Sequence, residues 1–445
     1  PLIGTAGMGH TFPGAVAPFG MVALSPDTDT IPHNIDGQYQ PRAYDYCAGY
    51  RYEDATIVGF SHTHLSGTGH SDLGDILLQP QTGRLRLQPG RAASPDEGYR
   101  SRFSHDTEQA RAGYYEVRLD DEQVRVQLTA TPRVGIHRYT YPAGEEERVI
   151  LDLGHGIYNY DGKVLWASIR VENDTLLTGY RITSDASHAL TLRVALSAVS
   201  TEGALRNLRA ETDGKTFEQL CDEARSVWDE ALSVLRCEGT ADQCRMLYTS
   251  LYHTMINPSI YMDVDRQYRG LDGNIHTAQG FDHYTVFSLW DTYRAQHPLL
   301  ALLQPERNAH MARSMLAHQQ QSVHHLLPIW SLMGNEGWCM TGYHAVSVLA
   351  DALAKGADLP RDAVLRAMVS TASSERMSGM KDYLAMGYVP FDRDQTAASN
   401  TLEYAYDDWT IYATAQAAGD TATARAFAQR AQSYRNVYNP ASGFA

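Results

Sequence analysis

The chain has 445 residues, of which 43% are hydrophobic, so it is long enough for two or more domains with sizeable cores and too apolar to be disordered throughout. Its formal net charge of −15 argues against a nucleic-acid partner, because polyanions bind basic surfaces. No apolar run approaches the ~20 residues that a membrane-spanning helix needs, so we expect no membrane span.

The cysteines are too few and too scattered for a disulfide framework, and none forms a Cys-x-x-Cys pair. Cys237 and Cys244 could pair, but we expect a buried thiol for each. The compartment is therefore not fixed by cysteine usage. Because the first residue is Pro1 and not Met, we expect that a preceding segment, with any export signal, has been removed.

A glycine-rich, hydroxyl-rich loop at 61–69 follows an apolar strand predicted at 56–60. His62 and His64 would point the same way from extended backbone, and glycines allow backbone to approach a ligand closely. We interpret this loop as lining a binding site, and the alternative is a structural turn with two exposed histidines. With Asp72 and Asp75 close behind, a Zn²⁺ or Fe²⁺ site is a further alternative.

The rest of the first half shows the period-two alternation of half-buried strands, at 115–119, 124–130 and 190–196. We predict an antiparallel β-sandwich over about residues 1–205. The spacing changes after Gly203, where an amphipathic helix is predicted from Phe217 to Leu235. Helices then dominate from about residue 240, and we predict them at 244–256, 307–318, 343–355, 361–374, 407–418 and 421–438.

Five carboxylates beside aromatic or polar residues are candidates for sugar chemistry: Asp291, Glu336, Glu403, Asp407 and Asp408. Glycoside hydrolysis needs a carboxylic acid for the departing oxygen and, for inversion, a base that activates water. Asp291 stands between Trp290 and Arg294, so a stacking face, an acceptor and a donor lie within one turn. The alternative is a salt bridge between Asp291 and Arg294.

Glu336 lies in a polar loop before a helix, together with Trp338, and could contact a ligand or simply complement the helix dipole. We expect Asp407 and Asp408 to open a helix, with one capping it and the other facing a cleft. His344 is interpreted as a hydrogen-bonded core histidine.

Several motifs together resemble glycoside hydrolase family 92, the calcium-dependent exo-acting α-mannosidases. In family order they are GTAGMGHTFPGA (4–15), PFGM (18–21), GFSHTHLSGTG (59–69), SLWDTYR (288–294), GNE (334–336) with WCM (338–340), GYHA (342–345) and TLEYAYDDW (401–409). The resemblance implies a multidomain β + α chain: an N-terminal antiparallel β-sandwich domain (1–205), a helical linker (206–239) and an (α/α)6-barrel catalytic domain (240–445) that is incomplete at its C-terminus.

The resemblance also implies function: an inverting exo-α-mannosidase that needs Ca²⁺, releases mannose from N-glycans or mannan, and is periplasmic, cell-surface or secreted. The loop 61–69 would form one wall of the pocket and the helical domain the rest. The implied substrate-binding residues are His62, His64, Trp290, Asp291, Arg294, Glu336, Trp338, Asp407 and Asp408.

Three family motifs are not in this sequence: a Glu-Gly-Asn-Ala-Trp-Gln-Tyr type motif with the acid, a Gly-Asn-Asp-Asp-Cys-Gly-Gln type motif with the base, and a His-Gly-Asn-Glu-Pro segment. We therefore expect the acid, the base and most Ca²⁺ ligands beyond Ala445, and expect this segment alone to be inactive and poorly soluble. At Asp185-Ala186, two strands that are well separated in the family nearly touch. Either this member has a short loop there or a segment is missing, and we expect the second.

Two alternatives stay open at this point. One is a hydrolase or phosphorylase acting on another sugar, although a phosphate site would want more basic residues than Arg294. The other is a non-catalytic glycan-binding protein.

Overall fold

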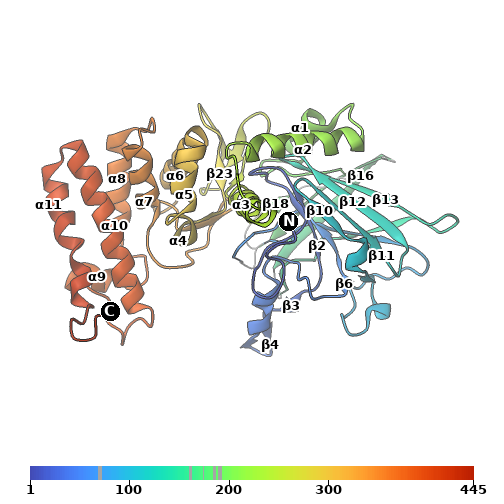
Figure 1. Ribbon diagram of the computed structural model, residues 1–445, viewed down its shortest axis with the longest axis horizontal. Helices are drawn as coiled ribbons and strands as arrows, with labels where there is room; N and C mark the ends of the chain where they lie inside the picture. Colours follow the sequence, from blue (N-terminus) through green and yellow to red (C-terminus); the bar gives the residue numbers. More distant parts are fainter. Residues whose placement is uncertain (69–72, 160–162, 174, 184–186, 189–192) are drawn as a thin grey trace. The chain divides into compact units, whose positions relative to one another are not determined.

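A computed structural model of the chain describes residues 1–68, 73–159, 163–173, 175–183, 187–188 and 193–445 (Figure 1). Asp72, the junction at Asp185-Ala186 and residues 190–192 lie outside these ranges. The chain forms two compact units, Pro1–Asp265 and Arg266–Ala445.

The first unit is built on two five-stranded antiparallel sheets. The first has the order β1 (Ala15–Val16), β2 (Ala23–Asp27), β7 (Gly59–Ser61), β8 (Leu77–Gln81) and β14 (Arg148–Asp152). The second has the order β10 (Gln109–Arg111), β11 (Tyr114–Leu119), β12 (Val124–Ala130), β13 (Val134–Thr140) and β19 (Arg193–Ala195).

The two sheets pack on each other, with β1 and β2 against β12. The alternation read from the sequence explains this, because Val117, Leu119, Val124, Val126 and Leu128 are all fully buried. Burying such side chains contributes about 1.5–3 kcal/mol each. The expected antiparallel β region is thereby confirmed.

Shorter elements complete the first unit. They are the meander β16 (Val164–Asn173), β17 (Leu176–Thr183) and β18 (Ser187–His188); the pairs β3 (Ile31–Pro32) with β15 (Tyr158–Asn159), β4 (Asn34–Ile35) with β5 (Gln38–Tyr39), and β6 (Thr56–Ile57) with β9 (Ser101–Arg102); β20 (Ser259–Ile260); and the 3-10 turns η1 (Pro41–Tyr46), η2 (Pro95–Glu97) and η3 (His105–Thr107).

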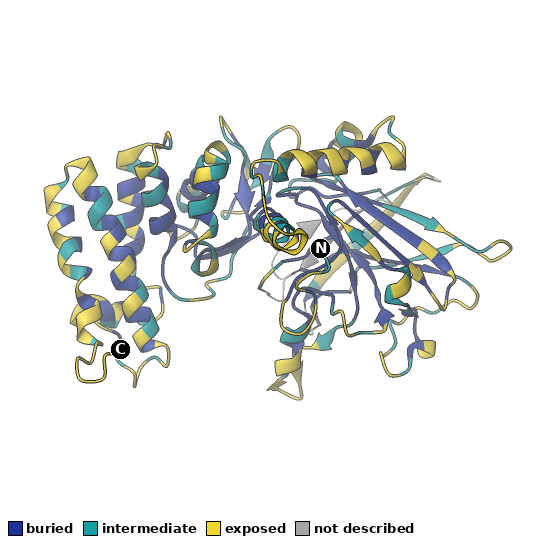
Figure 2. Cartoon of the chain, in the orientation of Figure 1, coloured by how far each residue is buried: buried dark blue, intermediate teal, exposed yellow. Residues whose placement is uncertain are grey.

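Three helices belong to this unit: α1 (Thr201–Thr212), α2 (Phe217–Leu232) and α3 (Ala241–Thr254). The Thr216 hydroxyl and the Gln219 side chain form a capping box that starts α2. The apolar face of α2 is buried, and its Trp228 indole N–H donates to the Val16 carbonyl at 2.6 Å. Segment 206–239, predicted as a linker, thus packs on the sheets (Figure 2).

The second unit is largely helical, as expected. Its helices are α4 (Leu289–Thr292), α5 (Gln296–Leu303), α6 (Pro305–Gln321), α7 (Ala345–Ala354), α8 (Arg361–Ala372), α9 (Met380–Met386), α10 (Ala397–Ala418) and α11 (Thr421–Arg430), with the 3-10 turn η4 (Ser433–Asn436). Helix α10 packs against α7, α8 and α11 (Figure 1). The strands are β21 (Gln267–Arg269) with β22 (Ile275–Thr277), β23 (Tyr284–Thr285), and the sheet β24 (Phe287–Ser288), β25 (Trp330–Leu332), β26 (Asn335–Glu336).

The predicted start of one helix is wrong. Helix α10 begins at Ala397 and not at Asp407, so both aspartates lie inside the helix and neither caps it. The sequence before Asp407 did not indicate a helix because it contains polar residues. Two of them, Asn400 and Thr401, are in fact buried in the helix and form hydrogen bonds there.

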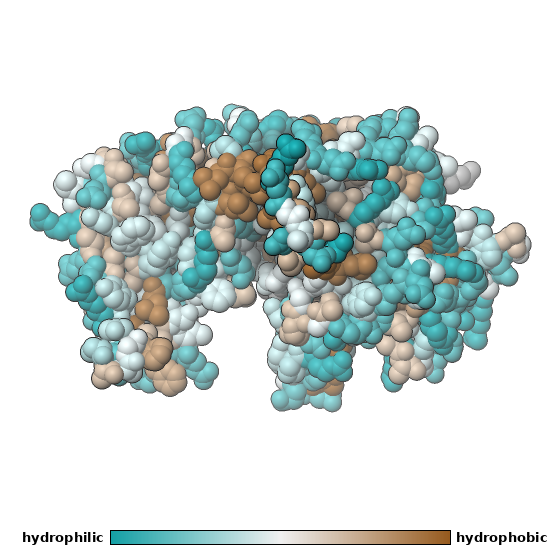
Figure 3. Space-filling view, in the orientation of Figure 1, coloured by the Kyte–Doolittle hydropathy of each residue, from teal (hydrophilic) through white to brown (hydrophobic). Residues whose placement is uncertain are grey.

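Hydrophilic residues cover most of the visible surface in the space-filling view, and hydrophobic residues form smaller patches (Figure 3). Within the described ranges, no helix combines the length and apolar character that crossing a membrane requires.

Candidate functional site

Glu403 of α10 collects three donors from one short segment of the second unit. Its carboxylate accepts the Trp290 indole N–H at 3.1 Å, the Tyr293 hydroxyl at 2.9 Å and the Arg294 guanidinium. The Glu403 side chain is only 13% exposed, whereas that of Arg294 is 52% exposed. Hydrogen bonds to a charged group are worth about 1.5–3 kcal/mol each, so Glu403 holds this segment firmly.

Ring contacts add to this order. The Tyr293 ring stacks on His344, with centroids 3.9 Å apart and planes 15° apart. The Arg294 guanidinium lies over the rings of Trp290 and Tyr293, at 5.7 Å and 4.7 Å from their centroids. A half-buried indole and an exposed cation are therefore held side by side at the surface.

Asp291 is exposed on the same segment and accepts the Ser288 hydroxyl. That hydroxyl in turn accepts the indole N–H of buried Trp330. The alternative of an Asp291–Arg294 salt bridge is wrong, because Arg294 pairs with Glu403. The orientation of the Asp291 carboxylate, next to Trp290 in the chain, is thus fixed by Ser288 and Trp330.

Behind Glu403 lies a buried imidazole between two carboxylates. His344 Nδ1 lies 2.8 Å from Asp407 Oδ1, and its Nε2 lies 3.6 Å from Glu403 Oε2. Asp407 is fully buried and also accepts the Tyr343 backbone N–H at 2.7 Å. Burial raises the pKa of Asp407, and His344 opposes that rise. The burial of His344 confirms its interpretation as a core histidine.

Asp408 faces a different set of partners. It accepts the hydroxyls of Tyr343 at 2.6 Å and Tyr383 at 2.7 Å, and it pairs with Arg430 at 2.9 Å. Burial raises the pKa of Asp408 to about 6, against the opposing charge of Arg430. Both aspartates are sealed from solvent, so any effect on a ligand passes through their partners.

Glu336 lies in strand β26 and not at a helix start. Its carboxylate accepts the backbone N–H groups of Ile329, Trp330 and Trp338 at 3.0, 2.8 and 3.1 Å. Burial raises the pKa of Glu336, and these N–H groups oppose the rise. Glu336 therefore fixes the turn that presents Trp338, whose side chain is partly exposed.

In the first unit, His62 and His64 are both buried, so neither is an exposed turn histidine. His62 Nδ1 donates to the Ile76 carbonyl at 2.6 Å, which leaves its Nε2 to accept from His137 Nε2 at 2.9 Å. His137 Nδ1 then accepts the Tyr139 hydroxyl at 2.8 Å. Burial lowers the pKa of His62 to about 4, which fits this neutral chain.

His64 belongs to a second buried cluster. Its Nδ1 faces the Ala23 carbonyl at 2.7 Å, and its Nε2 faces Asp27 Oδ1 at 2.9 Å. His155 contacts the other oxygen of Asp27 at 2.9 Å. Burial alone would raise the pKa of Asp27, but the two imidazoles lower it overall. Both predicted loop histidines thus hold strands together within the first unit.

No group of three or more His, Cys, Asp or Glu side chains in the described ranges is arranged to hold a metal ion. Ca²⁺ takes six to eight oxygen ligands, which can also come from backbone carbonyls and water. The Zn²⁺ or Fe²⁺ alternative has no support here, because the ring nitrogens of His62 and His64 contact protein groups and Asp72 is not described.

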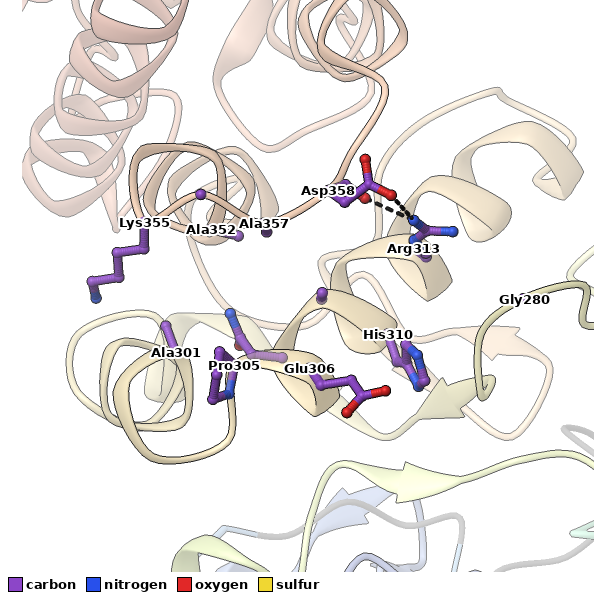
Figure 4. A pocket seen from close by; sticks show the side chains of 13 residues that line it. Gly280, Ala301, Pro305, Glu306, His310, Arg313, Ala352, Lys355, Ala357 and Asp358 are labelled. Carbon is purple, nitrogen blue, oxygen red and sulfur yellow. Dashed lines mark hydrogen bonds and ion pairs between the residues drawn. The ribbon is translucent and has the colours of Figure 1, made fainter.

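A pocket of about 310 Å³ lies elsewhere in the second unit, among α5, α6 and α7 (Figure 4). Glu306 and His310 of α6 line it, together with small residues. Its two basic side chains already have carboxylate partners, Arg313 with Asp358 and Lys355 with Asp351. None of the predicted site residues lines this pocket.

Comparison with known families decides what kind of protein carries these features. Residues 203–445 match the glycosyl hydrolase family 92 catalytic domain, and residues 1–197 match the glycosyl hydrolase family 92 N-terminal domain. The chain belongs to glycosyl hydrolase family 92. The resemblance read from the motifs is thereby confirmed.

Solved family 92 structures share its fold. A family 92 α-mannosidase from Bacteroides thetaiotaomicron, solved in complex with mannoimidazole, is 38% identical, with a TM-score of 0.91 over 99% of this chain and 64% of that one. A family 92 inverting mannosidase from the same organism is 25% identical, with a TM-score of 0.81 over 98% of this chain and 63% of that one.

A curated relative, an uncharacterized secreted glycosidase of Arthroderma benhamiae, is 23% identical over 92% of this chain and 58% of its own length. The chain thus spans less than two thirds of the length of these relatives.

Glu403 is one of the five candidate carboxylates predicted from the sequence, but its role as the acceptor for three donors was not predicted. Trp290 and Glu403 are 113 residues apart, so no local spacing could predict their bond. The hydrogen bond between the buried side chains of His62 and His137 could not be predicted either, because the two residues are 75 positions apart.

Proposed function

We propose that this protein is an inverting, exo-acting α-mannosidase that needs Ca²⁺. Its substrates would be mannose-terminated N-glycans or mannan, and it would act in the periplasm, at the cell surface or outside the cell. The helical unit would belong to an (α/α)6 barrel. The observation that carries the proposal is the family match together with 38% identity to an α-mannosidase that was solved with mannoimidazole.

The geometry supports a division of labour among the predicted residues. Trp290, Asp291, Arg294 and Trp338 are at least partly exposed and would contact sugar, because an indole face suits the apolar face of a ring and Asp291 can accept from hydroxyls. Glu336, Asp407 and Asp408 would position them through the backbone of Trp338, through His344 and through Tyr343. His62 and His64 would stiffen their loop from within. Residues for the acid and base are not assigned in this chain.

The test is turnover of an aryl α-mannoside by the protein expressed from its whole reading frame. NMR of the first sugar released should show β-mannose, which is the product of inversion. Release of α-mannose would contradict inversion, and titration heat with mannose but no turnover would identify a glycan-binding protein. A turnover that requires inorganic phosphate and yields a sugar phosphate would identify a phosphorylase.

The proposed metal has its own test. Dialysis against EDTA should abolish turnover, and Ca²⁺ should restore it while Mg²⁺ should not, because the smaller ion demands tighter octahedral geometry. Full turnover after chelation would contradict the proposed requirement.

A further inference from the structure

The connection between α2 and α3 brings two of the five cysteines together. Cys237 lies in the loop after α2, and Cys244 lies in the first turn of α3. Their Sγ atoms are 2.8 Å apart, which is closer than two non-bonded sulfur atoms normally approach. Both residues are partly exposed, unlike Cys47 and Cys221, so the prediction of buried thiols is wrong for this pair.

The backbone around the two sulfur atoms is held by contacts that do not involve them. The Thr240 hydroxyl accepts the Gln243 N–H at 3.3 Å, and the Gln243 side chain accepts the Thr240 N–H at 3.0 Å. The Tyr248 hydroxyl donates to the Leu235 carbonyl at 3.0 Å, which ties the loop back onto α3. The short sulfur–sulfur distance therefore belongs to an ordered connection.

We propose that Cys237 and Cys244 form an intramolecular disulfide when the protein is in an oxidising compartment. Two thiols lose two protons and two electrons as the S–S bond forms. A disulfide oxidant, either glutathione disulfide or a disulfide-bearing oxidoreductase, takes up both and becomes two thiols. Disulfides persist outside the reducing cytosol, and the relative described as a secreted glycosidase fits that setting. The assignment does not depend on the proposed mannosidase activity.

The disulfide would stabilise the connection between α2 and α3, which pack on each other in the first unit. Trp228 of α2 and Tyr252 of α3 pack together with ring centroids 4.6 Å apart, and Trp228 is bonded to Val16. Closing the short loop removes conformations from the unfolded chain, which stabilises the folded state. The bond would thus keep α2 and α3 together on the sheet.

Peptide mass spectrometry tests the proposal directly. The whole protein is equilibrated in a glutathione redox buffer, blocked with iodoacetamide and digested with trypsin. Cleavage after Arg236 and Arg245 releases residues 237–245 as one peptide that contains both cysteines. That peptide should be lighter than its dithiol form by two hydrogen atoms and should carry no alkyl group, whereas after dithiothreitol it should carry two.

Two alkyl groups on that peptide without reductant, or two glutathione adducts, would overturn the assignment. Cys339 is the internal control, because it is partly exposed and should be alkylated once in both samples. Cys237→Ser and Cys244→Ser should lower the melting temperature by several degrees in oxidising buffer and should match the wild type in dithiothreitol. Cys339→Ser should show no such redox dependence, and a wild-type melting temperature that is equal in both buffers would refute a stabilising bond.

Discussion

Asp291 illustrates how a side chain can be exposed and yet ordered. Its carboxylate is fixed by the Ser288 hydroxyl, which is itself fixed by the buried Trp330 indole. Such support from below lets a surface carboxylate keep one orientation without losing its contact with solvent. A ligand hydroxyl would then meet an acceptor that is already in place.

Asp291→Ala should lower kcat/KM for an aryl α-mannoside by more than tenfold, or ~1.4 kcal/mol, if this carboxylate binds the sugar in the transition state. The variant should melt close to the wild type, since Asp291 is exposed. Asp358→Ala removes another exposed carboxylate of the second unit and is the matched control. A loss below tenfold would mean that Asp291 only completes the turn.

Glu403 positions its neighbours, so its substitution should act through them. In Glu403→Gln an amide NH2 would face donors that now share a carboxylate, and Arg294 would lose its ion pair. We expect KM for the mannoside to rise at least tenfold while kcat changes little. Glu306→Gln, an exposed glutamate on α6, is the control. An unchanged KM would show that the three donors hold their places without Glu403.

At the scale of elements, the turn before α7 depends on a glycine for two separate reasons. Gly342 has a φ of +83°, and a Cβ there would lie 2.1 Å from His344 Nε2. Gly356 at the other end of α7 has a φ of +87°, but a Cβ there would meet nothing within 4 Å. The two positions therefore separate backbone strain from collision with the imidazole.

Gly356→Ala should cost about 1–2 kcal/mol of unfolding free energy, the usual price of a left-handed residue with a Cβ. Gly342→Ala should cost more by about 1–3 kcal/mol, because it also displaces His344 from buried Asp407. Urea unfolding of both variants measures the difference. Equal costs would show that the imidazole can move aside without loss.

The elements also show what sequence reasoning reaches. Helix α2 was predicted to start at Phe217 and does, because its apolar spacing and its cap are local signals. The start of α10 was missed because Asp407 and Asp408 look like cap residues, although tertiary partners bury them inside the helix. Glu336 was expected near a helix start for a similar reason, but backbone N–H groups hold it in a strand.

At the scale of the whole molecule, the order of the motifs along the chain predicted the family better than any single residue did. Local periodicity predicted the β region and the helical region, and the motifs predicted the family. The contacts of His62 with His137, and of Trp290 with Glu403, join distant segments and could not be predicted from spacing.

Buried histidines make the stability of the fold depend on pH. Burial lowers the pKa values of His62, His297 and His318 to about 4, below the ordinary 6.5. Between these values the unfolded chain binds protons that the folded chain refuses. The free energy of unfolding therefore keeps this contribution in full above pH 6.5 and loses it as the pH falls towards 4. Asp408 has a raised pKa, so its effect on the unfolding free energy has the opposite pH dependence over part of this range. The contribution of one histidine is therefore found by comparing the wild type with a variant that lacks it.

His318→Gln measures how much one buried histidine contributes to the pH dependence of the unfolding free energy. Glutamine keeps polar atoms at the buried position but cannot take up a proton. The wild type should be the more stable protein at pH 7, and its advantage over the variant should shrink by about 2–3 kcal/mol by pH 4.5. Urea unfolding at both pH values measures the two gaps, and the exposed His324→Gln controls for the loss of an imidazole. If the advantage of the wild type is the same at both pH values, His318 binds protons equally in the folded and unfolded chains, and the burial argument fails for it.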